Sequence, residues 1–207
     1  MELLASGRDC EVFLLDDGRV ARAYTDGRPA EAEATLIRRL HALGYPVPEV
    51  FGWEGPRIVM ARVAGPTLGE QLFAGEVTVA EAAATQADLQ ARLHALRWPG
   101  GEPLLHLDLH PLNVLVGPSG PVVIDWTNAR PGPPGLDVAM SALILAGVAL
   151  TGEVPEARDL LTAYAAVAPA PYADHLDEAA ALRLSTPHTT ADERRLMAQT
   201  VALAASP

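Results

Sequence analysis

The chain has 207 residues, and its 26 acidic and 15 basic side chains leave a formal net charge of −11. Every one of the 15 basic residues is an arginine, because the sequence contains no lysine. Nucleic-acid binding is not expected, since a surface that follows phosphates needs clustered cations. The only adjacent arginines, at 38–39 and 194–195, are isolated pairs on predicted helices. The acidity fits a cationic small-molecule partner, but it serves solubility equally well.

The single cysteine, Cys10, excludes an intramolecular disulfide. The first residues lack the basic start and the long apolar core of a signal peptide. The longest apolar run, residues 138–150, spans about thirteen residues, fewer than the roughly twenty that a bilayer requires. We therefore expect a cytoplasmic protein with no membrane attachment, either a monomer or a homodimer, in which this run is a buried helix.

Residues 1–64 predict a small antiparallel sheet that carries one helix. β-prone runs alternate with turn signals, and the Asp-Gly turn at Gly18 marks a hairpin. A stretch with apolar residues at helical spacing follows and ends at Gly44. The predicted elements are strands at 11–15 and 19–24, a helix at 30–43, and strands at 46–51 and 57–61.

Residues 65–207 predict a mostly helical part, which begins near Gly65-Pro66. It contains one more hairpin, from apolar strands at 114–116 and 122–124, and then a proline-rich loop at 130–135. The predicted helices cover residues 78–97, 138–150, 154–167, 173–184 and 190–204. The sequence contains no internal repeat.

The most specific feature is a loop motif that is completed by an aspartate after the hairpin. Asp108 stands five residues before Asn113, and Asp125 stands twelve residues after it. Phosphoryl transfer needs one carboxylate that accepts or orients the proton of the attacking hydroxyl. It also needs an amide oxygen and a second carboxylate that hold Mg²⁺ against the nucleotide phosphates. The three residues fit these roles in that order.

The pattern H-x-D-x-x-x-x-N, which begins at His106, and the later I-D-W resemble the aminoglycoside phosphotransferase and choline kinase branch of the protein-kinase-like fold. The resemblance implies a two-lobe α+β fold. Residues 1–64 would form a small antiparallel-sheet lobe that binds the nucleotide, and residues 65–207 a mostly helical lobe with the catalytic loop and the acceptor site. It further implies ATP and Mg²⁺ as cofactors and a small-molecule hydroxyl acceptor. With 207 residues, the chain is a short member.

On this resemblance Asp108 is the catalytic base, and Asn113 and Asp125 are the ligands of Mg²⁺. The residue that matches His106 is usually structural and steadies the loop by hydrogen bonds, although a direct part in the chemistry stays open. Asp137 matches a position that braces the catalytic loop, and a helix N-cap before residue 138 explains it equally well.

In the nucleotide lobe, Arg22 stands where protein kinases place the lysine that reaches the phosphates. Arginine can replace that lysine, because its guanidinium is a permanent cation that binds phosphate in a bidentate manner. Its expected partner on the following helix is Glu33, in preference to Glu31. The two glutamates are two positions apart and project to different faces of the helix, so only one can point at Arg22.

Two further nucleotide contacts are expected from position alone. Gly7 is either a phosphate-loop residue or part of a plain turn, because a complete glycine-rich loop is missing. The strand exit at Ala61 and Val63 matches the family's hinge, where unpaired backbone groups can bond to the edge of an adenine.

Three functions stay open. The first is a kinase for a small-molecule hydroxyl: an aminoglycoside, another sugar, a choline-like alcohol or homoserine, with a cationic acceptor favoured by the acidic helices after Asp137. The second is a pseudokinase that binds nucleotide with little transfer, which Arg22, the thin glycine loop and the short C-terminal part favour. The third is a metal-dependent hydrolase built on His106, Asp108 and His110, although such sites usually need further ligands. The sequence does not distinguish ATP from GTP.

Overall fold

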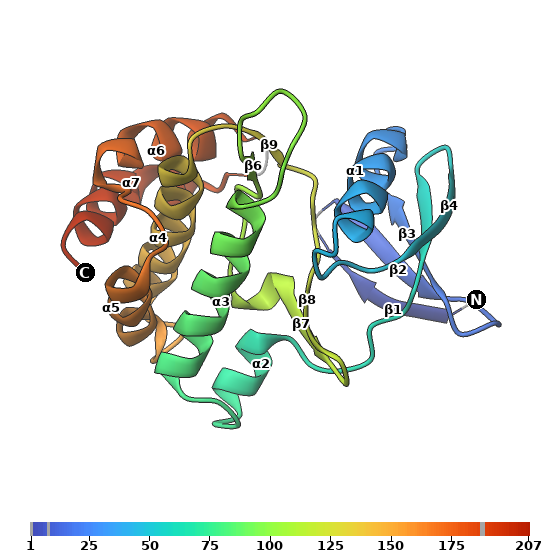
Figure 1. Ribbon diagram of the computed structural model, residues 1–207. Helices are drawn as coiled ribbons and strands as arrows, with labels where there is room; N and C mark the ends of the chain where they lie inside the picture. Colours follow the sequence, from blue (N-terminus) through green and yellow to red (C-terminus); the bar gives the residue numbers. More distant parts are fainter. Residues whose placement is uncertain (1, 8, 187–188) are drawn as a thin grey trace. The chain divides into compact units, whose positions relative to one another are not determined.

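The computed structural model describes residues 2–7, 9–186 and 189–207 (Figure 1). The chain forms two compact units. The sheet unit contains the chain up to Gly65 together with Leu115–Thr127, and the helical unit contains Pro66–Val114 and Asn128–Pro207. Both units are therefore built from two separate stretches of sequence. The division into a nucleotide-binding lobe at residues 1–64 and a lobe with the catalytic loop and acceptor site at residues 65–207 stays a prediction.

The sheet unit has a five-stranded antiparallel sheet in the order β1-β2-β3-β5-β4. Its strands are β1 (Glu2–Ser6), β2 (Cys10–Leu14), β3 (Val20–Tyr24), β4 (Val50–Glu54) and β5 (Arg57–Met60). The predicted hairpin is confirmed as β2 and β3, and Gly18 between them has a φ of 82°, which glycine adopts at little cost.

Two strands of this sheet differ from the prediction. β1 was not predicted, because its sequence, ELLAS, has no β-branched or aromatic residue. The strand expected at 46–51 begins only at Val50, since the prolines at 46 and 48 have no N–H for a ladder. The carbonyl of Pro46 instead accepts a hydrogen bond from the amide of Val123.

Helix α1 (Glu31–Ala42) packs beside strand β4. Its buried residues include Ala34, Ile37 and Leu40, the apolar positions that predicted the helix, and also Glu33. The backbone turns away from the helix at Gly44, which has a φ of 77°. A short hairpin, β7 (Val114–Gly117) with β8 (Gly120–Val123), also belongs mostly to the sheet unit.

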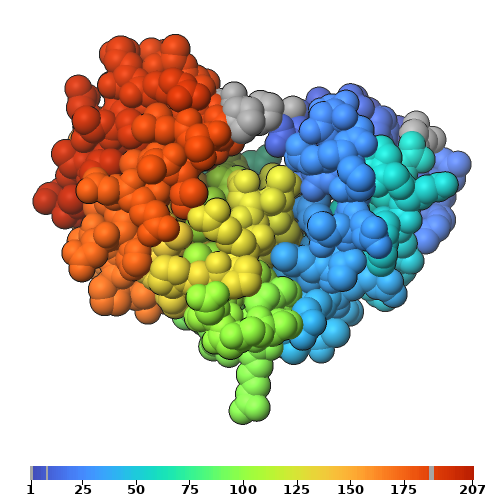
Figure 2. All heavy atoms as spheres, turned by 90° about the horizontal axis from the view of Figure 1, so that it is seen from above, coloured from blue at the N-terminus to red at the C-terminus, as the bar shows by residue number. Residues whose placement is uncertain are grey.

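The helical unit is built around α4 (Pro134–Thr151), which packs against α5 (Ala157–Val167), α6 (Leu176–Ser185) and α7 (Ala191–Ala205). The last two helices form one continuous mass of the unit, orange to red in Figure 2. The other elements of the unit are α2 (Leu68–Phe73), α3 (Val79–His94), β6 (Leu104–Leu105), η1 (Pro111–Asn113), β9 (Arg130–Pro131) and η2 (Ala173–His175). Three helices begin with capping boxes: α2 from Thr67, α3 from Thr78 and α7 from Thr190.

Helix α4 is longer than the sequence predicted. It covers 18 residues instead of about thirteen, because Pro134 occupies its first position, where the missing N–H of proline costs nothing. With a mean hydropathy of 1.7 it is the one helix among the described residues that is long and apolar enough to cross a membrane. However, 61% of it is buried inside the protein, which is also typical of a core helix. The predicted α+β composition, with a small antiparallel sheet and a mostly helical second part, is confirmed.

Candidate active site

The loop between β6 and η1 is held by one buried carboxylate. Asp137, in the first turn of α4, is fully buried. Its Oδ1 accepts hydrogen bonds from the amides of His106 (3.1 Å) and Leu107 (2.6 Å). Leu107 has a φ of 61°, a conformation that a leucine adopts only when its surroundings impose it. Asp137 therefore braces the loop. The N-cap position of α4 is Pro133.

The same carboxylate also contacts α3. Asp137 Oδ2 lies 2.8 Å from Nε2 of His94, which the sequence did not single out. Burial by itself would raise the pKa of Asp137, but the hydrogen bond and charge of His94 and the amide of Leu107 lower this pKa below its ordinary value. The loop is thus anchored to an ionised group that links α3 and α4.

His106 is completely buried, and its Nδ1 lies 3.2 Å from the amide nitrogen of Asp108, which donates to it. This nitrogen of the ring is therefore unprotonated. The contact is the loop-steadying kind of hydrogen bond that the resemblance implies for this residue.

Asp108, which precedes η1, and Asn113, the last residue of η1, are in contact. The side-chain amide of Asn113 donates to the carbonyl of Asp108 (2.9 Å) and lies 3.5 Å from its Oδ2. The five-residue spacing thus brings Asn113 back over Asp108 through one turn of 3₁₀ helix. Because Asn113 turns its nitrogen toward the loop, its amide oxygen is left for a hard cation, and oxygen donors of this kind suit Mg²⁺.

An arginine that the sequence did not indicate reaches the predicted base. Nη1 of Arg183, on α6, lies 3.5 Å from Oδ1 of Asp108, and its Nη2 donates to Glu193 Oε1 of α7 at 2.9 Å. Arg183 and Asp108 are 75 residues apart, and no motif contains Arg183. No sequence signal could have found this pair.

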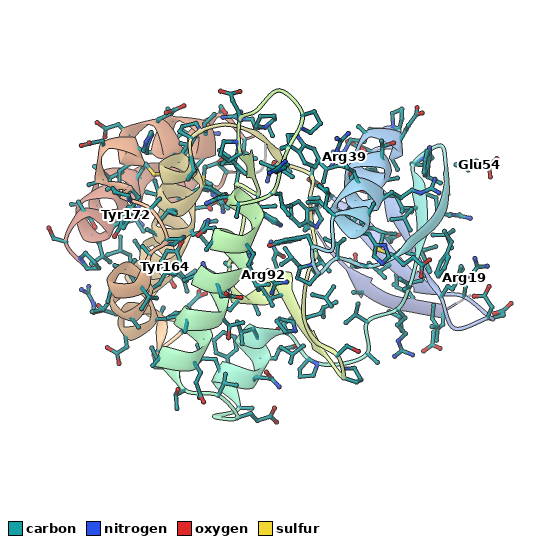
Figure 3. The ribbon with its side chains drawn as sticks, viewed as in Figure 1. Arg19, Arg39, Glu54, Arg92, Tyr164 and Tyr172 are labelled. Carbon is teal, nitrogen blue, oxygen red and sulfur yellow. The ribbon has the colours of Figure 1, made fainter. Side chains whose placement is uncertain are left out.

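Polar side chains of two helices donate to the carbonyl of Leu109, and a third helix joins their network. It accepts hydrogen bonds from Gln86 of α3 (3.0 Å) and Ser141 of α4 (2.8 Å). Gln90 of α3 bonds to Ser141 and accepts a short hydrogen bond from Tyr164 of α5, and Tyr164 is labelled among these helices in Figure 3. Burial raises the pKa of Tyr164, which stays a neutral donor. The residue after Asp108 is thus tied directly to α3 and α4, and through Gln90 to α5.

In the sheet unit, Arg22 of β3 lies between two carboxylates. It makes a short ion pair with Glu33 of α1, and its Nη2 lies 2.8 Å from Oδ1 of Asp125. Burial by itself would lower the pKa of Arg22, but the two carboxylates raise it above its ordinary value. Glu33, rather than Glu31, therefore faces Arg22, which is a permanent cation.

Glu33 also ties α1 to the segment after β8. Its Oε1 accepts from the amide of Trp126 (3.1 Å), and the hydroxyl of Tyr24 makes a short hydrogen bond to its Oε2. Asp125, just before that tryptophan, has a φ of 63°. A left-handed backbone of this kind is uncommon for a residue other than glycine.

The carboxylate of Asp125 is 40% exposed. Its Oδ1 accepts from Arg22 and from the hydroxyl of Thr127 at 3.0 Å. Its Oδ2 makes no hydrogen bond to the part of the chain that the structure describes. Asp125 therefore keeps a free carboxylate oxygen, which is a suitable donor for Mg²⁺.

The other predicted nucleotide contacts are backbone positions. The amide of Gly7 donates to the carbonyl of Cys10 (2.8 Å) within the turn between β1 and β2. The amide of Ala61, just after β5, donates to the carbonyl of Glu49 (2.8 Å), so only its carbonyl is left for a ligand. The main chain of Val63 forms no hydrogen bond with residues 2–7, 9–186 or 189–207. The structure thus brings Arg22, Glu33 and Asp125 together in one unit, and His106, Asp108 and Asn113 in the other.

The group of metal ligands that a hydrolase would need is not found in the part of the chain that the structure describes. Among the described residues, no three His, Cys, Asp or Glu side chains come together as ligands of a metal ion. His106, Asp108 and His110 therefore do not share one metal position.

Comparison with known proteins places the chain among kinase-like enzymes. The model of the phosphotransferase enzyme family matches residues 97–175, and that of the RIO domain matches residues 13–131, more than half of the chain. Comparison with curated proteins gives no significant match.

Solved structures share the fold at low sequence identity. Aminoglycoside phosphotransferase APH(2'')-Ib with ADP bound is 14% identical, with a TM-score of 0.61 over 99% of this chain and 91% of that chain. The ternary complex of APH(2'')-IIa with streptomycin and ATP is 13% identical, with a TM-score of 0.59 over 97% and 90%. An aminoglycoside-3'-phosphotransferase of type VIII is 18% identical, with a TM-score of 0.55 over 99% and 92%. The chain therefore belongs to the protein-kinase-like family that includes both the aminoglycoside phosphotransferases and the RIO domain, as its loop motif predicted.

Proposed function

We propose that this protein is an ATP- and Mg²⁺-dependent phosphotransferase that moves the γ-phosphoryl group onto a hydroxyl of a small molecule. The observation that carries the proposal is the braced catalytic loop. A fully buried carboxylate, Asp137, binds two successive amides of the loop that presents Asp108. A brace of this kind orients a catalytic group at no cost during the reaction.

In this proposal Asp108 accepts a hydrogen bond from the acceptor hydroxyl and orients it for attack. A base in this role lies about 2.6–3.2 Å from the oxygen whose proton it takes. His106 and Asn113 hold the base from either side, through its amide and its carbonyl. Catalysis then consists mostly of positioning and charge neutralisation.

The nucleotide-side roles follow from donor chemistry within each unit. Asn113 and Asp125 each offer an oxygen of the kind that Mg²⁺ takes, and a bound Mg²⁺ would neutralise charge on the nucleotide phosphates. Arg22 offers a permanent, fork-shaped cation to the phosphates. The main chain at Gly7, Ala61 and Val63 would contact the rest of the nucleotide. ATP is proposed as the donor because two similar structures hold ADP or ATP.

The proposed acceptor is a small alcohol. Streptomycin in one similar structure supports a small-molecule acceptor. A cationic acceptor was expected from the acidic helices after Asp137, but most of those acids are exposed to solvent, as they would be if they served solubility alone. They are Glu153, Glu156, Asp159, Asp174, Asp177 and Glu178.

A nucleotide-binding module with little transfer is the second candidate. It is favoured by the ion pair of Arg22 with Asp125. In this pair the guanidinium that would bind phosphate is already bound to one oxygen of the proposed Mg²⁺ ligand. It is also favoured by the turn at Gly7, whose amide is already used by Cys10. Such a module would bind ATP without phosphorylating any alcohol.

The first test is thermal unfolding of the full chain with and without ATP, in Mg²⁺ and in EDTA. A ligand at 100 times its Kd stabilises the native state by about 2.7 kcal/mol. For a chain of this size that corresponds to a rise in Tm of about 5 to 11 °C. We expect this rise in Mg²⁺ and its loss in EDTA.

Two variants complete the test. Asp125→Ala should lose the Mg²⁺-dependent rise, whereas Asp17→Ala, an exposed change in the turn after β2, should keep it. ATP-dependent release of ADP is then measured with alcohols as acceptors. Binding without transfer to any of them would favour the second candidate, and the absence of any shift with ATP would contradict both.

A further inference from the structure

We propose that Arg183 makes the acceptor site selective for hydroxy acids, that is, alcohols with a carboxylate near the reacting hydroxyl. The inference rests on the proposed function, because it takes Asp108 as the residue that binds the acceptor hydroxyl. It adds the charge of the acceptor, which the family and the fold leave open.

The guanidinium of Arg183 is close to the base but only loosely bound to it. Its Nη1 lies 3.5 Å from Oδ1 of Asp108, whereas a tight pair between a cationic N–H and a carboxylate spans about 2.7–2.9 Å. Arginine has five N–H donors, and the contacts with Asp108 and Glu193 engage two of them. Within the described residues the others have no partner, and the side chain is 26% exposed. Donors are therefore available to a ligand that enters beside Asp108.

Glu193 holds this arginine in place. Its Oε1 accepts from Arg183, while its Oε2 accepts from the amide of Thr190 at 2.8 Å in the capping box of α7. Because the glutamate is fixed by the helix end, it positions the guanidinium before any acceptor arrives. A cation that is already oriented loses less entropy on binding its ligand.

The distances determine which part of an acceptor meets Arg183. A hydroxyl oxygen within about 2.6–3.2 Å of Oδ1 of Asp108 lies no farther than about 7 Å from Nη1, given the 3.5 Å between that Oδ1 and Nη1 of Arg183. A carboxylate one or two carbons from that hydroxyl can reach the guanidinium and match its fork with two hydrogen bonds. A protonated amine in the same position would meet a like charge.

The overall acidity of the chain does not reverse this preference. Its net charge of −11 is spread over the whole sequence, and exposed charges are screened beyond about 8 Å at physiological ionic strength. Arg183 would act on a bound acceptor at contact distance, where screening is weak.

The test measures kcat/KM of the full chain for ATP-dependent phosphorylation of glycerate, gluconate and 3-hydroxybutyrate, each beside its uncharged amide. Ethanolamine and streptomycin represent cationic acceptors. For at least one pair we expect the acid to be preferred over its amide by at least about tenfold. Arg183→Gln should lower kcat/KM for that acid by about 10- to 100-fold and leave the amide nearly unchanged, since a hydrogen bond to a charged group contributes on this scale. Arg195→Gln, which removes an exposed arginine of α7, should keep the acid-to-amide ratio.

The outcomes separate this inference from the proposed function. If Arg183 were only structural, its replacement would slow acid and amide equally, and the unchanged ratio would overturn the inference. A preference for ethanolamine, streptomycin or the amides would also overturn it, while the phosphotransferase function would stand. No transfer to any of these acceptors, with ATP bound, would overturn the function and the inference with it.

Discussion

Replacing Asp137 with asparagine tests whether an ionised carboxylate braces the catalytic loop. The side chain is fully buried and contacts two loop amides and Nε2 of His94. The asparagine side chain would keep the shape and one acceptor oxygen but would lose the charge and the acceptor that faces His94. The net value of a hydrogen bond to a charged group is about 1.5–3 kcal/mol, so the free energy of unfolding should fall by that amount. For a chain of this size, Tm should fall by about 3 to 12 °C.

Asp137→Ala should cost more, about 3–5 kcal/mol, because it leaves the two amides and the imidazole without their buried partner. Urea denaturation followed by circular dichroism measures both losses. Asp177→Asn, an exposed change on α6, serves as the control and should stay within about 0.5 kcal/mol of the parent. A loss below about 0.5 kcal/mol for Asp137→Asn, no larger than that of an ordinary surface change, would refute the brace.

The pH dependence of the stability difference between the parent and Asp137→Asn tests whether Asp137 is ionised. The pKa of Asp137 in the folded protein lies below its ordinary value, so the folded state binds the proton more weakly than the unfolded state. The stability that this group contributes is therefore complete above the unfolded pKa, about 3.9. The gap between the parent and Asp137→Asn should shrink as the pH falls below about 4. A gap that stays constant down to about pH 3 would contradict the assignment of the charge.

Three further changes test the rest of the site. Asp108→Asn should reduce phosphoryl transfer by about 10²- to 10⁴-fold, the usual contribution of a general base, and leave the ATP-dependent rise in Tm intact; transfer at the parent rate would show that another group acts as base. Glu33→Gln weakens the ion pair with the buried guanidinium of Arg22 and should lower the free energy of unfolding in urea by about 1.5–3 kcal/mol. The control Glu31→Gln should be nearly neutral, and equal effects of the two changes would argue against the pair of Arg22 with Glu33. Gly65→Ala would place a Cβ 2.0 Å from a backbone carbonyl oxygen at a φ of 149°. Its Tm should fall well below that of Gly52→Ala, where the added carbon meets nothing within 4 Å. Similar melting temperatures would mean that the backbone at Gly65 relaxes freely.

Local sequence patterns predicted much of the architecture. The turn at Gly18 and the helical spacing of Ala34, Ile37 and Leu40 predicted their elements correctly, because both are properties of a few consecutive residues. The first and last residues of the strands and helices were less predictable where the local sequence carried only a weak signal. β1 has no strong β-former, the prolines at 46 and 48 shortened a predicted strand, and Pro134 extended α4 beyond its apolar run.

The family could be recognised from the chain alone, through the spacing of Asp108, Asn113 and Asp125, since the first two lie within one loop and the third follows the adjacent hairpin. Which groups meet across long separations was decided by the packing of the folded chain. Asp125 reaches Arg22 over 103 residues and Asp108 reaches Arg183 over 75. Such pairs depend on how whole elements pack, and a single arginine on a helix or strand carries no local signal of its partner. The charge beside the proposed base was therefore visible only once the helices were in place.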